Sequence, residues 1–345
     1  MDEVKLTAEV PPADTPDAAS LAPLAGGDPE HEVSAQAWKK ARELALRQLD
    51  LLVSLEPRAL SGDDPDAVHG LRVASRRLQQ VLDLLHPAPQ HGEVRRLRKK
   101  VRRCRRALGE VRNFDVLLAR VNKAVVAKRT SRRDAWLAVK DYLLKRRQQS
   151  LDRAARKLAK MNFVRFYAHL KGWIVPNGAA PQPSVERLAA PVFHERVAQD
   201  LAKSWKAFEA RLALSHRDAA APAVHRVRIA AKRFRYLIEV VNAFGVPGSD
   251  ETLGWLRRLQ RHLGNWHDVE VLEQMMIEMV GRPEFLRDHL ELAMSVEKLI
   301  IRNRAAKKKF EEEYFGMTQS SAGLERLRGW VSYVLASPSA AFATA

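Results

Sequence analysis

Apolar residues recur at steps of three and four along most of the chain, which is the period of an amphipathic α-helix. The first such stretch places Trp38, Ala45 and Leu49 on one face. Ser34 is its candidate N-cap, and Pro57 is expected to end the helix. Few segments alternate apolar and polar residues in the manner of a strand, so the sequence predicts an all-α protein.

One short pattern occurs twice, at residues 67–78 and again at residues 223–234. On a helix that turns by about 100° per residue, each copy has a polar stripe and an apolar stripe on opposite faces. The polar stripes hold a histidine and basic residues at helical spacing: His69, Arg72 and Arg76 in the first copy, and His225, Arg228 and Lys232 in the second. Each copy therefore predicts a helix with one face in a core and a basic face toward an anion.

A second pattern also occurs twice, and it is a basic helix that leads into a Leu-Gly pair. Lys99 lies on the first of these helices, well away from its apolar seam, and is a candidate for binding a chain of phosphates. Aligning the two Leu-Gly pairs places Arg103 and Arg106 over Arg258 and Arg261. A glycine inside a helix lowers its stability by roughly 1 kcal/mol. We therefore expect the two glycines, Gly109 and Gly264, at helix ends or close-packed positions, and Asp268 as a cap for a following helix.

Composition separates the repeats from tails and a linker. Residues 1–33 are rich in Ala, Pro and acidic residues, which is typical of a disordered tail. Residues 172–191 carry most of the Pro and Gly in the middle of the chain, which predicts a linker. Residues 319–345 are expected to form a short C-terminal helix and a mobile tail.

The two halves lie on either side of this linker, at residues 34–171 and 192–318. Long helical regions are expected at residues 132–171 and 284–315, near the end of each half. Together with the repeated segments, they give about four helices per half. The sequence thus predicts an internally duplicated protein, with two four-helix bundles related by a pseudo-twofold axis around a basic groove.

Basic residues outnumber acidic ones by 59 to 41, which gives a formal net charge of +18. Residues 1–33 hold one base and eight acids, a net of −7, which leaves +25 for the rest of the chain. An excess of this size is typical of proteins that bind a polyanion or an anionic surface. Solvated basic helix faces are the alternative that composition leaves open.

Cys104 is the one cysteine of the sequence, so an internal disulfide is excluded. Its apolar helical position predicts a buried thiol in a reducing compartment. The sequence has no apolar run of about 18 residues or more, and its N-terminus lacks the pattern of a secretory signal. We therefore expect a cytoplasmic protein that does not span a membrane.

Rows of Arg and Lys at helical spacing suit a chain of phosphates. Each side chain reaches a successive phosphate, and Arg can donate two hydrogen bonds to one group. Further basic residues of the second half are candidates for the same row, namely Lys203, Lys206, Lys307 and Lys308. Nucleic acid satisfies the same charges, but Tyr236 is the one aromatic residue on a basic stripe, where single-strand readers use several. Nonspecific nucleic-acid binding is therefore the main alternative.

Motifs for catalysis are absent from the sequence. It contains no Gly-rich phosphate loop, no His-Glu-x-x-His and no cysteine nucleophile with an evident partner. His69 and His225 lack metal-ligand spacing from another His or Cys, so we expect neither a metal nor a cofactor. A polyphosphate or triphosphate hydrolase that uses these two histidines is the second alternative.

The two histidine-led segments and the two Leu-Gly motifs closely resemble the CHAD family, the conserved histidine α-helical domain. The resemblance covers roughly residues 34–318. It implies an all-helical, duplicated domain that binds inorganic polyphosphate in a basic central groove and localises to polyphosphate granules. By this match the binding residues are His69, Arg72, Arg76, Arg77, Arg103, Arg106, His225, Arg228, Lys232, Arg233, Arg258 and Arg261.

The chain departs from the family pattern in modest ways. Family members often have Arg-Asp after the Leu-Gly pair, whereas this chain has Arg112-Asn113 in the first half and His267-Asp268 in the second. The Glu-x-Glu-x-Lys motif of the catalytic domain that is sometimes fused to the family is absent. The sequence therefore predicts a noncatalytic polyphosphate-binding protein that is associated with polyphosphate granules and has nucleic acid as a weaker competitor.

Overall fold

The computed structural model describes residues 29–86, 92–127, 132–175, 193–218, 220–319 and 321–343. Within these ranges the regular elements are helices, and no strand is present. The all-α prediction is therefore confirmed. Most of the N-terminal tail and of the linker lies outside the described residues.

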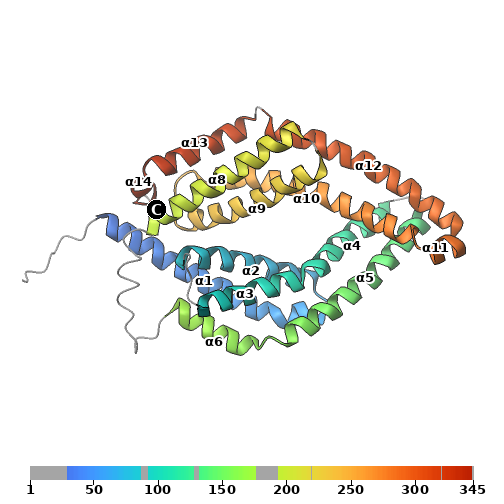
Figure 1. The fold of residues 1–345 in the computed structure, drawn as a ribbon, viewed down its shortest axis with the longest axis horizontal. Coiled ribbons are helices and arrows are strands. Elements are labelled where there is room, and N and C mark those ends of the chain that lie inside the picture. The colour runs from blue at the N-terminus through green and yellow to red at the C-terminus, as the bar shows by residue number, and fades with distance from the viewer. Residues whose placement is uncertain are drawn as a thin grey trace, which may run out of the picture.

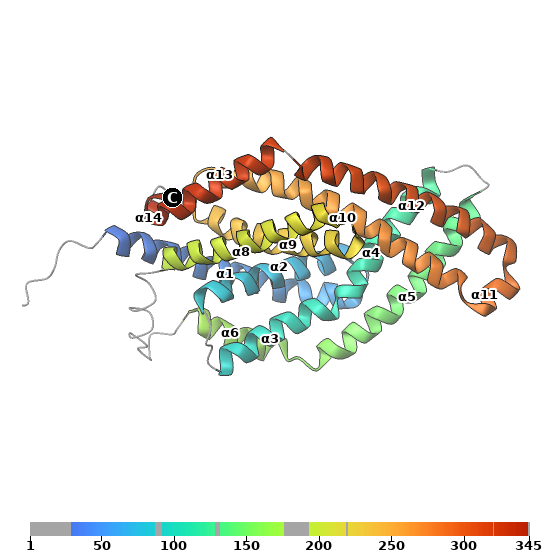
Figure 2. The ribbon, with the colours of Figure 1, turned by 45° about the horizontal axis from the view of Figure 1, so that its top comes forward.

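Toward the left of Figure 1 the helices of the first half lie below those of the second half, and toward the right the two sets meet. The first set is α1 (Pro29–Ser61), α2 (Pro65–Leu85), α3 (Gly92–Ala107), α4 (Gly109–Ala127), α5 (Arg133–Ala159) and α6 (Phe163–Ile174). The second set is α8 (Phe193–Arg217), α9 (Ala221–Ala243), α10 (Ser249–Val280), α11 (Pro283–Asp288), α12 (Leu290–Thr318), α13 (Ala322–Ala336) and α14 (Pro338–Ala343). The molecule is elongated, and α4 and α5 converge with α10 and α12 at one end (Figures 1 and 2).

The largest buried cluster draws on both halves of the chain. Leu52 of α1 and Leu78 of α2 belong to the same cluster as Phe208 of α8 and Phe234 of α9. The two phenylalanine rings stack with their centroids 5.8 Å apart. Burial of side chains of this size stabilises a fold by about 2 kcal/mol each. The halves are therefore fastened together by one continuous core, while the predicted pseudo-twofold axis stays a prediction.

Two smaller clusters complete the interior. One joins α4 and α5 to α10 and α12 at the far end of the molecule, through residues such as Leu143 and Met276. The other lies within the first half and contains Cys104, whose Sγ is 3.8 Å from Met161 Sδ. Burial raises the pKa of the Cys104 thiol to about 12. The prediction of a buried free thiol is confirmed, and a thiol with a raised pKa is a poor nucleophile.

Helix α1 is longer than the sequence predicts at both ends. It begins at Pro29, and acidic side chains in its first turn interact favourably with the helix dipole. Ser34 is buried inside the helix, where its Oγ accepts a hydrogen bond from the Phe193 amide at 2.7 Å. Pro57 does not end the helix, which continues to Ser61. The prediction failed because a proline removes one backbone donor but does not prevent the last turn from forming.

Other boundaries also differ from the prediction. The helical region expected over residues 132–171 is broken after α5, because the Asn162 side chain accepts a hydrogen bond from the Arg165 amide at 2.8 Å and caps α6. Residues 172–174, assigned to the linker, belong to α6. The region expected over residues 284–315 is divided into α11 and α12. Part of the tail expected to be mobile forms α14, because Phe342 is buried in the shared core.

The two Leu-Gly motifs have different structures. Gly109 begins α4 directly after a break at Leu108, as predicted. Gly264 lies in the interior of α10, and a Cβ added there would meet nothing within 4 Å. The expectation for Gly264 is therefore wrong, and Asp268 is an interior residue of α10 instead of a cap. The core contacts along α10 outweigh the weak helix propensity of one glycine.

Gly62 is the position at which the fold most directly requires glycine. Its φ is +84°, and an added Cβ would overlap the Leu151 side chain. We predict that Gly62→Ala lowers the free energy of unfolding by about 2 kcal/mol, measured by urea denaturation. The control is Gly172→Ala in α6, where an added Cβ meets nothing within 4 Å. It should leave stability unchanged or raise it by about 0.5 kcal/mol, and equal losses in the two variants would contradict this account.

Candidate functional site

The two repeated helices, α2 and α9, pack side by side at the centre of the molecule (Figures 1 and 2). Arg76 of α2 donates a hydrogen bond to the Tyr236 hydroxyl of α9 at 3.3 Å, and its guanidinium lies 5.2 Å from the centre of that ring. Arg77 forms an ion pair with Glu239 of α9 at 2.9 Å. The polar stripes of the two helices therefore meet each other.

Basic residues from four helices gather where these stripes meet, and we refer to them as the central cation cluster. Its members are His69, Arg72 and Arg76 of α2, Arg105 of α3, Arg112 of α4, and His225, Arg228 and Lys232 of α9. Except for the exposed His69, their side chains are half-buried. The members lie close to one another, because each arginine of the cluster and Lys232 lowers the pKa of at least one other member.

Burial and mutual repulsion make the charged forms of the cluster's side chains less favourable than they would be in water. Burial, together with the charges of Arg228, Arg76 and Arg72, lowers the pKa of Lys232 to about 7. Burial likewise lowers the pKa of Arg72 and of Arg105 to about 10 each. Like charges that are partly removed from water repel strongly, so a multivalent anion placed among them would relieve this repulsion.

Arg72 links the cluster to the junction between α3 and α4. Its Nη1 donates a hydrogen bond to the backbone carbonyl of Arg105, in the last turn of α3. A Cβ added to Gly109 would lie 3.3 Å from the same nitrogen. The glycine thus admits the Arg72 side chain to the break between the two helices, which is the close-packing role expected for it.

Two histidines of the second half lie beside the cluster, with the rings of His225 and His267 5.1 Å apart. Burial, together with the Arg228 charge, lowers the pKa of His267 to about 3, so this ring is neutral at physiological pH. Within the described part of the chain, the buried atoms Arg228 Nε and His267 Nδ1 have no hydrogen-bond partner, although a Glu270 carboxylate oxygen lies 4.0 Å from His267 Nδ1. The Arg228 N–H is therefore a donor that a ligand at this point could use.

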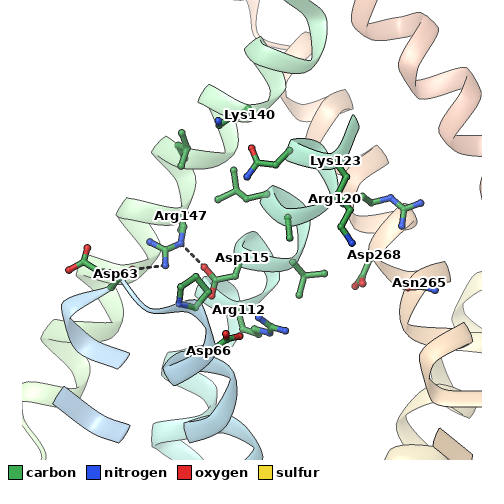
Figure 3. A pocket seen from close by; sticks show the side chains of 17 residues that line it. Asp63, Asp66, Arg112, Asp115, Arg120, Lys123, Lys140, Arg147, Asn265 and Asp268 are labelled. Atoms are coloured by element: carbon green, nitrogen blue, oxygen red, sulfur yellow. Dashed lines mark hydrogen bonds and ion pairs between the residues drawn. The ribbon is translucent and has the colours of Figure 1, made fainter. Parts of the chain in front are cut away.

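A pocket of about 710 Å³ adjoins the cluster between α4, α5, α10 and the start of α2 (Figure 3). Arg112 and Asp268 line it. Its wall is fixed by Arg147, which donates to Asp115 Oδ1 at 2.6 Å and to the Gly62 carbonyl at 2.7 Å. The pocket carries both signs of charge, from Arg112, Arg120, Lys123, Lys140 and Arg147 and from Asp63, Asp66, Asp115 and Asp268.

The structure brings together six of the residues selected from the sequence, namely His69, Arg72, Arg76, His225, Arg228 and Lys232. Others are exposed on α3, α8, α9, α10 and α12: Lys99, Arg103, Arg106, Lys203, Lys206, Arg233, Arg258, Arg261 and Lys308. Lys307 is half-buried and forms an ion pair with Glu270 at 3.3 Å. A binding role for these residues stays a prediction.

Sequence analysis missed Arg105, Arg120 and Asp268 as neighbours of the cluster. The predicted residues of α3, Arg103 and Arg106, stand farther from its apolar seam than Arg105 does. Because Arg105 flanks that seam, it faces α2, and its Nη1 donates to Gln79 Oε1 at 2.8 Å. The position of Arg105 beside the seam could therefore have identified it from the sequence, because a residue beside an apolar seam points toward the neighbouring helix.

Comparison with known proteins places the fold among characterised helical domains. The structure is similar to the crystal structure of the CHAD domain from the plant Ricinus communis, with a TM-score of 0.61 and 22% identity over 83% of this chain and 92% of that one. It is also similar to PptA from Streptomyces chartreusis, with a TM-score of 0.53 and 13% identity over 81% of this chain and 98% of that one. No curated protein has a matching sequence.

Fold and cluster together define an all-α protein with a cationic centre. The family model of the CHAD domain matches residues 43–276. The chain therefore belongs to the CHAD domain family. Within the described ranges, no group of three or more His, Cys, Asp or Glu side chains could hold a metal ion, and no helix is long and apolar enough to cross a membrane.

Lys232 provides a test of the repulsion in the cluster. Above pH 10.5, the ordinary lysine pKa, it is neutral in both the folded and the unfolded state; between pH 10.5 and about 7 only the unfolded state gains the proton, so stability falls as pH falls. We predict that Lys232→Met raises the free energy of unfolding at pH 7 by about 2 kcal/mol, and that this gain shrinks toward pH 10.

The measurement is urea unfolding of both proteins at pH 7, 8, 9 and 10. Lys203→Met is the matched control, because Lys203 is exposed on α8. It should change stability by no more than about 0.5 kcal/mol. A Lys232→Met variant that is less stable than the original protein at pH 7 would show that Lys232 contributes to folding.

Proposed function

We propose that this protein binds inorganic polyphosphate, without hydrolysing it, through the central cation cluster. The observation that carries the proposal is that the basic stripes of α2 and α9, separated by the length of a whole repeat in sequence, form one cluster with Arg105 and Arg112. A site assembled from four helices suits a chain of charges better than a single small anion.

The chemistry of the cluster supports a phosphate polymer. Arg guanidinium groups donate paired hydrogen bonds to phosphate oxygens, and Lys232 adds a compact charge whose protonation a nearby polyanion would favour. Arg228 Nε has no hydrogen-bond partner among the described residues, so its N–H can donate to a phosphate oxygen. Membership of the CHAD family supports the same proposal, and with it an association with polyphosphate granules in the cell.

Nucleic acid is disfavoured by the environment of Tyr236. This side chain is 4% exposed, and its ring is covered by the guanidinium groups of Arg76 and Arg235, 5.2 and 4.7 Å from its centre. A base could not stack on it without displacing them. Single-strand binding relies on such stacking, so the cluster offers nucleic acid its charges alone.

Hydrolysis is the remaining alternative, and His69 and His225 are its candidate residues. The structure places them on different helices, with His225 against the ring of His267. His69 is exposed and His225 is half-buried, and both lie beside arginines. This position suits a hydrogen bond from each ring to a phosphate. Phosphate release from polyphosphate, assayed with and without Mg²⁺, should equal that of a protein-free control.

A competition titration tests the ligand class. Long-chain polyphosphate should displace labelled single-stranded DNA of equal charge from the protein, and the reverse displacement should need a large excess of DNA. Because counterions are released, log affinity for polyphosphate should fall linearly with log salt concentration. Equal competition by the two polymers, or no polyphosphate binding at moderate salt, would contradict the proposed function.

A second experiment tests which cations bind. We predict that the pair Arg72→Gln and Arg228→Gln, within the cluster, weakens polyphosphate binding about 100-fold. The matched pair Arg156→Gln and Arg302→Gln removes the same charge from exposed positions on α5 and α12, outside the predicted binding residues, and should weaken it about fivefold or less. Isothermal titration calorimetry gives the affinities, and thermal unfolding verifies that both variants are folded. Equal losses of affinity in the two double variants would show that binding depends on the overall charge of the protein and not on the cluster.

A further inference from the structure

Asp268 is a carboxylate that faces the cations of the candidate site. It lies on α10 next to His267, is half-buried, and lines the pocket beside the cluster. Arg228 and Lys232 of α9 and Arg120 and Arg112 of α4 all lie close enough to act on its charge. Figure 3 shows it on α10, beside the side chains of Arg120 and Lys123 of α4.

No direct ion pair holds this carboxylate in place. Among the described residues, no basic nitrogen lies within 4.0 Å of an Asp268 oxygen. Asp115 of the same pocket is different, because Arg147 binds it at 2.6 Å and joins it to the turn at Gly62. Asp115 thus fastens the wall of the pocket, whereas Asp268 has no comparable structural contact.

The charged form of Asp268 is unfavourable even before a ligand arrives. Burial raises the pKa of Asp268 above its ordinary value, although four surrounding cations act in the opposite direction. The aligned position of the first half is Asn113, which is exposed and neutral. Of the two aligned positions, only that of the second half carries a carboxylate. There, burial makes the charged form less favourable in the folded protein than in the unfolded chain.

A polyanion bound to the cluster would be repelled by this carboxylate. The same residues that attract phosphates, namely Arg228, Lys232 and Arg112, surround Asp268. Phosphate oxygens that approach them also approach the aspartate, and like charges in a partly desolvated site repel over several ångströms. This repulsion weakens the binding of any phosphate chain that occupies the centre of the cluster.

We propose that Asp268 limits the affinity of the central cation cluster for polyphosphate, so that a bound chain is released and exchanged. The inference rests on the proposed function and assigns to that site a residue that sets how long the ligand stays. Without the aspartate, a site with this many cations would release a multivalent chain very slowly, since affinity differences between related complexes lie mainly in the dissociation rate.

The test is Asp268→Asn, a change that removes the charge and keeps the shape. The variant should bind long-chain polyphosphate about tenfold more tightly at pH 7 and low salt, mainly through slower dissociation, as measured by surface plasmon resonance. The difference should shrink at high salt, because screening weakens an electrostatic repulsion. Its melting temperature should equal or exceed that of the original protein.

Two further variants serve as controls. Asp268→Glu keeps the charge and should retain the original affinity within about twofold. Asp63→Asn makes the same chemical change at an exposed residue on the opposite wall of the pocket, and its effect should be much smaller than that of Asp268→Asn (Figure 3).

The outcomes separate this inference from the proposed function. If the original protein does not bind polyphosphate, the proposed function fails and the inference fails with it. If the original protein binds but Asp268→Asn binds equally or more weakly, only the inference fails. A variant that melts several degrees lower, or does not fold, would show that Asp268 is a structural residue and would also overturn the inference.

Discussion

Repulsion among partly buried cations is the interaction that the rest of the structure has to accommodate. Arg72, Arg76, Arg228 and Lys232 are held together although each raises the free energy of the others. The opposing contribution comes from the shared core, in which Leu78 of α2 and Phe234 of α9 are fully buried beneath the same helices. Apolar burial thus holds in place a set of charges that would separate in water.

This arrangement explains why stability and binding are expected to change in opposite directions at the site. Removing Lys232 relieves repulsion in the empty protein and removes an attractive charge from the bound one. Residues that are unfavourable for folding and yet concentrated at one place are typical of functional sites. The unpaired Arg228 Nε and the uneven placement of Asp268 and Asn113 belong to the same pattern.

Several features of the candidate site were predictable because they depend on helical periodicity alone. The spacing of His69, Arg72 and Arg76 places them on one face of any helix, and the copy at His225, Arg228 and Lys232 does the same. Arg105 and Asp268 were missed for a related reason. Each takes part through the neighbour that its helix meets, and periodicity within one helix does not identify that neighbour.

By itself, the sequence determined the all-α class, the two basic stripes and the burial of Cys104, because each follows from residue spacing within single helices. Tertiary structure decided which stripes meet. It also decided that α10 continues through Gly264 while the first half breaks at Gly109, and that residues near the C-terminus fold as α14. These outcomes depend on long-range contacts, such as Arg72 at the break and Phe342 in the shared core, whose energies outweigh local propensity.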